Sequence, residues 1–408
     1  MRLRIPRLGR PFWLIWLATT ASSLGDGVRM VAFPLIAASI TRDPSAVAVV
    51  SMAGFLPWLL FGLVGGAVVD RTDRRGLMWR TDLVRAALVG GFAALVAAGS
   101  VAIATLAVVS FLLGVAEIFF DNAASAIVPM LVEDSRIEQA NSWIFSTQNV
   151  MATLLGAPIG GALYAVGRAV PLVTDAASFL LSAILVAAVA GEFRARSAEA
   201  APTTIRQDIA DGLRWLFTHR LLRVLALLLA VLNATFAAAE AVLVLYALEV
   251  LHLSTVGYGL LLTLIAVGGL VGTALAPTLL RRLGLRPMLV GVGLVQGVML
   301  VGVGVSSSLV MAVAAMLLVG GTSMAWNVVT VSLRQRVVPA ALLGRVTSSY
   351  RVIGFGAMPL GALLGGGLAR TYGLHSPYLV SGVVLLTATL GCLPFITEPV
   401  PAVQPSRP

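Results

Sequence analysis

The sequence predicts an all-α membrane protein with twelve transmembrane helices. Hydrophobic residues make up 59% of the 408 positions and charged residues only 11%, whereas soluble domains are about 25% charged. Many apolar runs reach the length of about 20 residues that a helix needs to cross a hydrocarbon core. The runs are continuously apolar and do not alternate at every second residue, which favours helices over the strands of a barrel.

Each expected helix is a segment that stays apolar over a window of about 19 residues. In the first half of the chain these segments lie near 12–39, 46–69, 77–98, 101–125, 142–166 and 170–190. In the second half they lie near 222–248, 255–280, 287–306, 308–328, 347–369 and 377–397.

The net charge of +10 reflects membrane topology. An even number of spans places both termini on one side, and that side receives 24 arginines against three on the other, with Arg29 inside the membrane. Cytoplasmic loops carry such an excess of basic residues. We therefore expect a multi-pass protein of a bacterial plasma membrane with both termini in the cytoplasm, and no nucleic-acid partner.

Several classes of chemistry are disfavoured by the residue types. All 28 basic residues are arginine, so the chain has no lysine for a phosphate-binding loop or a Schiff base. The three histidines, His219, His252 and His375, lack the mutual spacing of metal ligands. We expect no enzyme activity, no cofactor and no metal site.

A polar stretch over 191–221 divides the chain into two expected bundles of six helices, 1–190 and 222–408. Within this stretch, apolar residues recur at helical spacing and predict an amphipathic helix on the cytoplasmic membrane surface. These residues are Ile205, Ile209, Leu213, Leu216 and Phe217. A disordered linker with chance periodicity is the alternative.

The two halves also repeat short patterns. The sequence "PIGGAL" of the fifth span returns as "PLGALL" in the eleventh, as expected of a transporter built from two related units. Glycines four residues apart suggest close helix packing, although a glycine-rich chain also forms such pairs by chance. The pairs are Gly62 and Gly66, Gly156 and Gly160, Gly268 and Gly272, and Gly361 and Gly365.

The loop after the second span reads "GGAVVDRTDRR". It resembles the loop signature of the major facilitator superfamily, through Gly66, Asp70, Arg71, Arg74 and Arg75. Together with "SSLGDGVRMVAFPL" and "GRVTSSYRVIGFG", the chain is similar to the bacterial drug-efflux branch that includes macrolide and enterobactin exporters. This resemblance implies the major facilitator fold of two six-helix pseudo-repeats and a gating role for the loop, with Asp121 pairing with loop arginines such as Arg71 or with Arg85.

One motif departs from the family pattern. The antiporter signature of the fifth span places proline directly after glycine, but here Ala157 separates Gly156 from Pro158. Antiport therefore gains no support from this motif.

Charged residues inside the predicted spans are the candidate site. Asp26 lies about 14 residues into the first span, with Arg29 one turn further on the same face. A charge at that depth costs at least about 2.5 to 3.5 kcal/mol, so it should face a partner or a wet cavity. Glu117 and Glu240 lie at similar depth with no basic neighbour in their own helices. Burial favours the neutral form of such carboxyls, which is typical of proton carriers.

The resemblance implies that spans one, four, seven and ten line the cavity. Span ten supplies Thr322, Ser323, Trp326 and Asn327. Aromatic side chains are expected either in the wall of the cavity or in the core; they are Trp16, Phe33, Phe119, Phe236 and Trp326. Asp26 and Arg29 are either functional or an ion pair that neutralises itself, and Asp175 is expected near the membrane interface.

We expect proton coupling by Glu117, Glu240 and Asp26. The expected substrate contacts are Asp26, Arg29, Glu117, Glu240, Asn327 and Trp326. The predicted function is export of a lipophilic cationic or neutral small molecule by proton antiport, with protons, substrate and the lipid bilayer as partners of a monomer. Uptake by proton symport, siderophore export and a non-transporting membrane sensor are the alternatives.

Overall fold

The computed structural model describes residues 8–69, 71–191, 193–194, 205–339 and 342–396, and these residues form helices and short connections without any strand. In the first half, the long helices are α1 (Gly9–Ile40), α2 (Pro44–Val69), α3 (Arg74–Ala97), α4 (Ile103–Ile127) and α7 (Val170–Ala187). Between α4 and α7 the chain forms α5 (Ile137–Asn149), a π-helical segment (Val150–Gly156) and α6 (Ala157–Val166), which run on as one element.

The second half begins with α8 (Ile205–Thr218) and α9 (Arg220–Leu245), and α9 continues as a π-helical segment (Tyr246–Val250). The remaining long helices are α10 (Thr255–Leu283), α11 (Leu285–Val305), α12 (Leu309–Val337), α13 (Leu343–Gly356), α14 (Met358–Tyr372) and α15 (Ser376–Cys392).

Eleven helical stretches of the described chain are long and apolar enough to cross a membrane. The predicted span at 77–98 is absent from this set, although α3 forms there and packs against α4 and α7. Arg80, Asp82 and Arg85 lower the apolar character of α3. The expected helix is therefore present, but its composition differs from that of the other spans.

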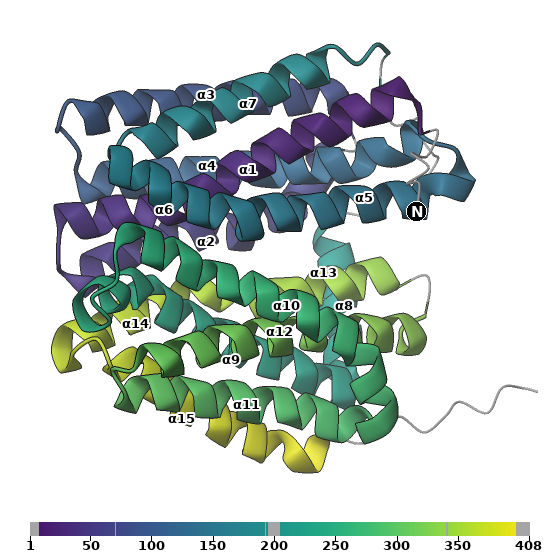
Figure 1. Cartoon of the computed structure of the whole chain (residues 1–408). Helices are drawn as coiled ribbons and strands as arrows, with labels where there is room; N and C mark the ends of the chain where they lie inside the picture. Colours follow the sequence, from purple (N-terminus) through teal and green to yellow (C-terminus); the bar gives the residue numbers. More distant parts are fainter. Residues whose placement is uncertain (1–7, 70, 192, 195–204, 340–341, 397–408) are drawn as a thin grey trace, which may run out of the picture.

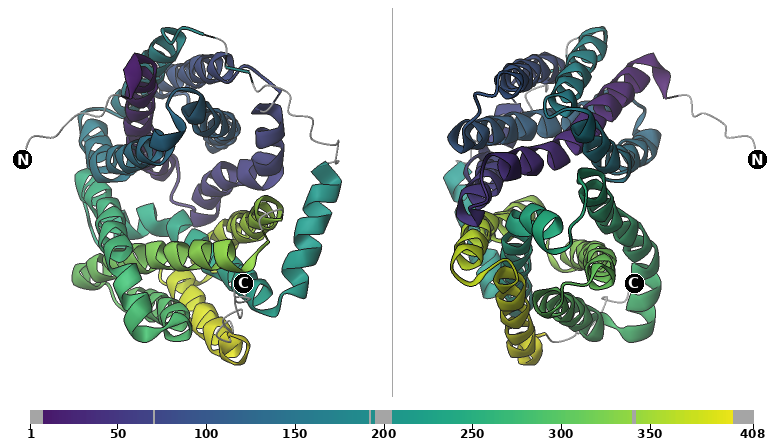
Figure 2. Two further views of the ribbon diagram at one scale, coloured as in Figure 1. Left: turned by 90° about the vertical axis from the view of Figure 1, so that its right-hand side faces the viewer. Right: turned by 60° about the vertical axis from the view of Figure 1, so that its left-hand side comes forward.

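The helices form two layers (Figure 1). The helices from α1 to α7 pack mainly on one another, as do those from α9 to α15. Contacts between the layers are made chiefly by α2 with α14 and by α6 with α10. The predicted amphipathic segment forms α8, which lies at the side of the molecule (Figure 2) and packs against α13. In α8, Leu216 is buried while Phe217 is exposed; the side chains before Asp211 lie outside the described part.

Three of the four predicted glycine pairs make close helix contacts. A Cβ on Gly268 or Gly272 would overlap the backbone of α12, and one on Gly361 or Gly365 would overlap that of α9. Gly156 and Gly160 likewise meet the backbone of α1. The pair in α2 is different, because Gly66 has open space where its Cβ would be.

Polar contacts between the layers gather at one end of the molecule, the end opposite to the start of α1 and the end of α15. Between described residues of the two layers, we find four pairs joined by hydrogen bonds or ion pairs, and all lie at this end. They are Arg42 with Glu249 at 3.2 Å, Asp43 with Arg370 at 3.7 Å, Ser45 with the Gly366 carbonyl at 3.3 Å, and Thr255 with the Gly161 carbonyl at 3.1 Å.

Candidate functional site

A network of buried charges joins α1, α3, α4 and α7. Asp26 is its centre, because one carboxylate oxygen, Oδ1, meets Nη2 of Arg29 at 2.5 Å and Nη2 of Arg85 at 2.9 Å. Nε of Arg29 also lies 3.2 Å from Oδ2 of Asp175, and its Nη2 lies 3.7 Å from Oε2 of Glu117. Arg29 therefore contacts carboxylates from three different helices.

The second guanidinium of the network belongs to α3. Nη1 of Arg85 lies 3.4 Å from Oδ1 of Asp82 and donates a hydrogen bond to Oγ of Ser22 at 3.3 Å. The guanidinium carbon also lies 4.1 Å from the centre of the Phe179 ring, a cation–π contact. Arg85 is thus held by α1, α3 and α7 together.

The glycines around Asp26 allow these helices to approach one another. A Cβ on Gly25 would collide with Asp175 and Ser178 of α7, and one on Gly27 would overlap the backbone of Ala152 in the π-helical segment. Because glycine has no side chain, α1 can lie directly against both neighbours. Because Gly25 and Gly27 flank Asp26, the carboxylate of Asp26 lies where α1 contacts both α7 and the π-helical segment.

Burial differs strongly within the network. The side chains of Asp82 and Asp175 are 0% exposed and that of Arg85 is 1% exposed, whereas that of Glu117 is 36% exposed. Neither oxygen of Asp175 accepts a well-aligned hydrogen bond within the described part of the chain. The network thus has a sealed side at Asp82 and Asp175 and an accessible side at Glu117.

Negative charge exceeds positive charge in this region. Asp121 lies one turn beyond Glu117 on α4, and it forms no ion pair with any described residue. With all groups ionised, the five carboxylates of Asp26, Asp82, Glu117, Asp121 and Asp175 face two guanidiniums. Uncompensated buried charge is costly, so this surplus favours the binding of protons or of a cationic group.

Glu240 lies apart from this network, on α9 in the other layer. It forms no ion pair within the described residues, and its buried Oε2 has no hydrogen-bond partner there. The structure therefore brings Asp26, Arg29 and Glu117 together and leaves Glu240 as a separate carboxyl.

The predicted site residues of span ten, which forms α12, differ in their exposure and contacts. Trp326 is 4% exposed and belongs to the core, while Asn327 is exposed. Thr322 and Ser323 both accept hydrogen bonds from the amide of Gln296, at 3.1 and 3.0 Å. Of the aromatic residues proposed for the cavity wall, Phe33 also belongs to the core, where it packs edge-to-face on Phe92.

One sequence expectation about a charged residue is wrong. Asp175 does not lie at an interface, because it is fully buried against Arg29. Sequence reasoning also missed that Arg85 pairs with Asp26 inside the bundle. The signal that identifies Arg85 is its spacing of three residues from Asp82, the same spacing that links Asp26 and Arg29.

The signature loop is only partly within the described structure. Asp70 lies outside it, and Arg71 is exposed. Nη1 of Arg74 approaches the sulfur of Met130 at 2.8 Å, and Arg75 donates to the carbonyl of Ala187 at 2.6 Å. Asp121 has no ion pair with Arg71 or Arg85, so the expected pairing with these arginines is not formed.

Comparisons with known proteins agree with this architecture. The chain is 29% identical to the multidrug efflux pump Tap of Mycobacterium tuberculosis, over 93% of this chain and 92% of the pump. It is 22% identical to macrolide efflux protein A of Streptococcus pyogenes, over 95% of this chain and 96% of that protein.

Among solved structures, the nucleoside transporter NupG superposes with a TM-score of 0.80 at 11% identity, covering 95% of this chain and 100% of NupG. A bacterial homologue of the iron transporter ferroportin superposes with a TM-score of 0.75 at 21% identity, covering 95% and 99%. The family model described as transmembrane secretion effector matches residues 6–405. The chain therefore belongs to this family of major facilitator superfamily transporters, which are multi-pass membrane proteins that move small molecules and are not enzymes.

Proposed function

We propose that this transporter exports a lipophilic cationic or neutral small molecule in exchange for protons. The observation that carries the proposal is the surplus of carboxylates over guanidiniums around Arg29, together with the accessible position of Glu117. The similarity to multidrug and macrolide efflux proteins supports the direction of transport and the class of substrate.

The proposal includes an arrangement of twelve transmembrane helices, with α3 as the twelfth span. The charges of α3 do not argue against a membrane position, because Asp82 and Arg85 are buried and paired inside the bundle. We assign residues 1–190 and 222–408 to two six-helix pseudo-repeats and residues 191–221 to a linker. The excess of arginines at the end with the termini supports a cytoplasmic location of both.

The described contacts support a state that is closed to the outside. All polar contacts between described residues of the two layers lie at the end opposite to the termini. With the termini in the cytoplasm, that end is external. In this state substrate would reach Glu117 from the cytoplasm, and the proton that it displaces would leave to the cytoplasm.

In the proposed cycle, substrate and protons compete for the same carboxylates. A cationic substrate that binds between the layers would be attracted by Glu117 and Glu240 and would displace their protons. Asp26 acts through the arginines, because a proton on its carboxyl would weaken the contacts to Arg29 and Arg85 at once. Asn327 and Arg29 would contact polar parts of the substrate, and Trp326 would have to become accessible to do so.

A transport assay tests this function. The chain is expressed in a bacterium lacking its own drug pumps, and ethidium, a lipophilic cation, is followed by fluorescence with and without a protonophore. We expect protonophore-sensitive efflux that is lost in Glu117→Gln and in Glu240→Gln and kept in Glu133→Gln, whose carboxylate is exposed. If both buried-site variants expel ethidium as the wild type does, these carboxylates do not couple transport to protons.

A further inference from the structure

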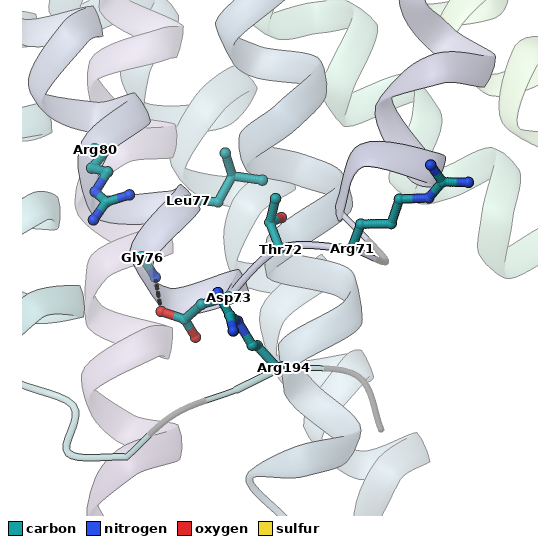
Figure 3. A pocket seen from close by; sticks show the side chains of 7 residues that line it. All are labelled: Arg71, Thr72, Asp73, Gly76, Leu77, Arg80 and Arg194. Carbon is teal, nitrogen blue, oxygen red and sulfur yellow. Dashed lines mark hydrogen bonds between the residues drawn. The ribbon is translucent and has the colours of Figure 1, made fainter. Parts of the chain in front are cut away.

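A second site of unusual charge lies at the end of the molecule where α1 begins and α15 ends. It is a pocket of about 390 Å³ between the α2–α3 loop, the first turns of α3 and the segment that follows α7 (Figure 3). Its lining residues are Arg71, Thr72, Asp73, Gly76, Leu77, Arg80 and Arg194. Three arginines and one aspartate thus share one small cavity, which lies away from the charge network around Asp26.

The aspartate offsets only one of the three positive charges, and two backbone N–H groups hold its carboxylate in place. Oδ2 of Asp73 accepts a hydrogen bond from the backbone N–H of Gly76 at 2.8 Å, which caps the first turn of α3. Oδ1 accepts from the backbone N–H of Phe193 at 2.9 Å. Asp73 therefore fixes the floor of the pocket and ties α3 to the segment after α7.

The three arginines retain free donor groups. Within the described residues, Arg71, Arg80 and Arg194 form no ion pair and donate no side-chain hydrogen bond, whereas the neighbouring Arg75 donates to the carbonyls of Ala187 and Gly191. Arg80 lies against the ring of Trp79, with 5.3 Å from the guanidinium carbon to the ring centre. In Figure 3, Arg194 is drawn near Asp73, Arg80 lies beyond Gly76 on α3, and Arg71 extends away from both.

We propose that this pocket binds a phosphate group, either in the headgroup of an anionic phospholipid or in a soluble phosphate compound. Guanidinium groups match phosphate in geometry and charge and can bind it through two parallel hydrogen bonds. The pocket is of the size that holds small ligands. A phosphate bound by Arg80 and Arg194 links the start of α3 to the segment after α7 and so stabilises that part of the protein.

Thermal unfolding of the purified full-length protein in a non-ionic detergent tests the proposal. A thiol-reactive dye that reports exposure of the partly buried Cys392 follows unfolding. The probes are dihexanoyl phosphatidylglycerol, dihexanoyl phosphatidylcholine and inorganic pyrophosphate. The variant Arg80→Gln/Arg194→Gln removes two guanidiniums of the pocket, and Arg282→Gln removes an exposed arginine from the same end of the other layer.

We expect phosphatidylglycerol or pyrophosphate to raise the unfolding temperature with saturation. The Arg80→Gln/Arg194→Gln variant should need about 30-fold more ligand for half of the effect, because each arginine near such a surface contributes about a fivefold factor. The Arg282→Gln protein should respond as the wild type does.

The two sources of phosphate are distinguished by the probes. A response to phosphatidylglycerol without one to pyrophosphate identifies a lipid headgroup, and a response to pyrophosphate identifies a soluble phosphate. The proposal is overturned if neither probe stabilises the protein, if phosphatidylcholine acts equally, or if the pocket variant responds like the wild type. Both variants leave the carboxylates of the transport site in place, so the outcome is independent of the proposed antiport.

Discussion

At the scale of single residues, the main feature is that Arg29 and Arg85 share the carboxylate of Asp26. Two guanidiniums that share one carboxylate oxygen repel each other. The arrangement is stable because Arg85 also pairs with Asp82 and Arg29 also pairs with Asp175. Removing one partner from a buried ion pair leaves the other charge uncompensated, whereas removing both leaves a neutral pair. Arg29 and Asp175 should therefore be strongly coupled in their effect on stability.

A double-mutant cycle measures this coupling. Arg29→Gln should lower the free energy of unfolding by about 3 to 5 kcal/mol, because it leaves the buried Asp175 without a cation. Asp175→Asn should cost less, because Asp26 and Glu117 still face Arg29, and Arg29→Gln should cost less when Asp175→Asn is also present. The measurement is denaturation of the purified protein in detergent. Asp43→Asn, which removes the exposed partner of Arg370, should cost less than about 1 kcal/mol. Additive losses for Arg29 and Asp175 would show that the buried pair is not coupled.

At the scale of elements, glycines decide how closely the helices pack. Gly272 of α10 and Gly321 of α12 touch through their backbones, so a Cβ on Gly272 has no room. Gly291 of α11 is also helical, but its Cβ would meet open space. The two positions therefore separate the cost of lost packing from the intrinsic gain of replacing glycine by alanine in a helix.

Gly272→Ala and Gly291→Ala form a matched pair of variants. We expect Gly272→Ala to destabilise the protein by about 1 to 3 kcal/mol, because backbones must move apart. Gly291→Ala should be neutral or more stable by up to about 1 kcal/mol. Thermal unfolding of both proteins provides the comparison, and equal effects at the two positions would contradict the packing argument.

The helices were largely predictable from the sequence, and the network only in part. Long apolar runs must be helical in a membrane, so the element over 77–98 was expected even though α3 carries more charge than its neighbours. Asp26, Arg29 and Glu117 were recognised because they interrupt such runs. Asp175 was misplaced because its depth was judged from its distance to the start of its own helix, whereas its environment is set by α1. The contact between Asp175 and Arg29 depends on how α7 packs against α1, which the sequence of either helix alone does not show.

At the scale of the whole molecule, the two layers meet through small residues at the end opposite to the termini. A Cβ on Gly366 of α14 would overlap the Cβ of Ala48 of α2, so these helices touch directly. Alternating access requires this contact to open and to form again during each cycle. A side chain that keeps it from forming should therefore slow transport without changing the charge network.

Gly366→Ala tests this requirement, because its added Cβ would overlap Ala48 whenever the two layers meet at this end. We expect slower ethidium efflux in this variant. Gly367→Ala, whose Cβ would meet open space, should transport as the wild type does. Equal efflux in the two variants would show that this contact need not form during the cycle.

If substrate and protons exchange at the buried carboxylates, the flux of one drives the flux of the other, and proton flux in reconstituted vesicles measures this coupling. Ethidium is allowed to flow down its gradient through the purified protein while a trapped dye reports the internal pH. We predict that the wild type moves protons against the direction of ethidium, and that Glu117→Gln/Glu240→Gln abolishes this movement. Ethidium flux without proton movement in the wild type, or unchanged proton movement in the double variant, would show that these carboxylates do not exchange substrate for protons.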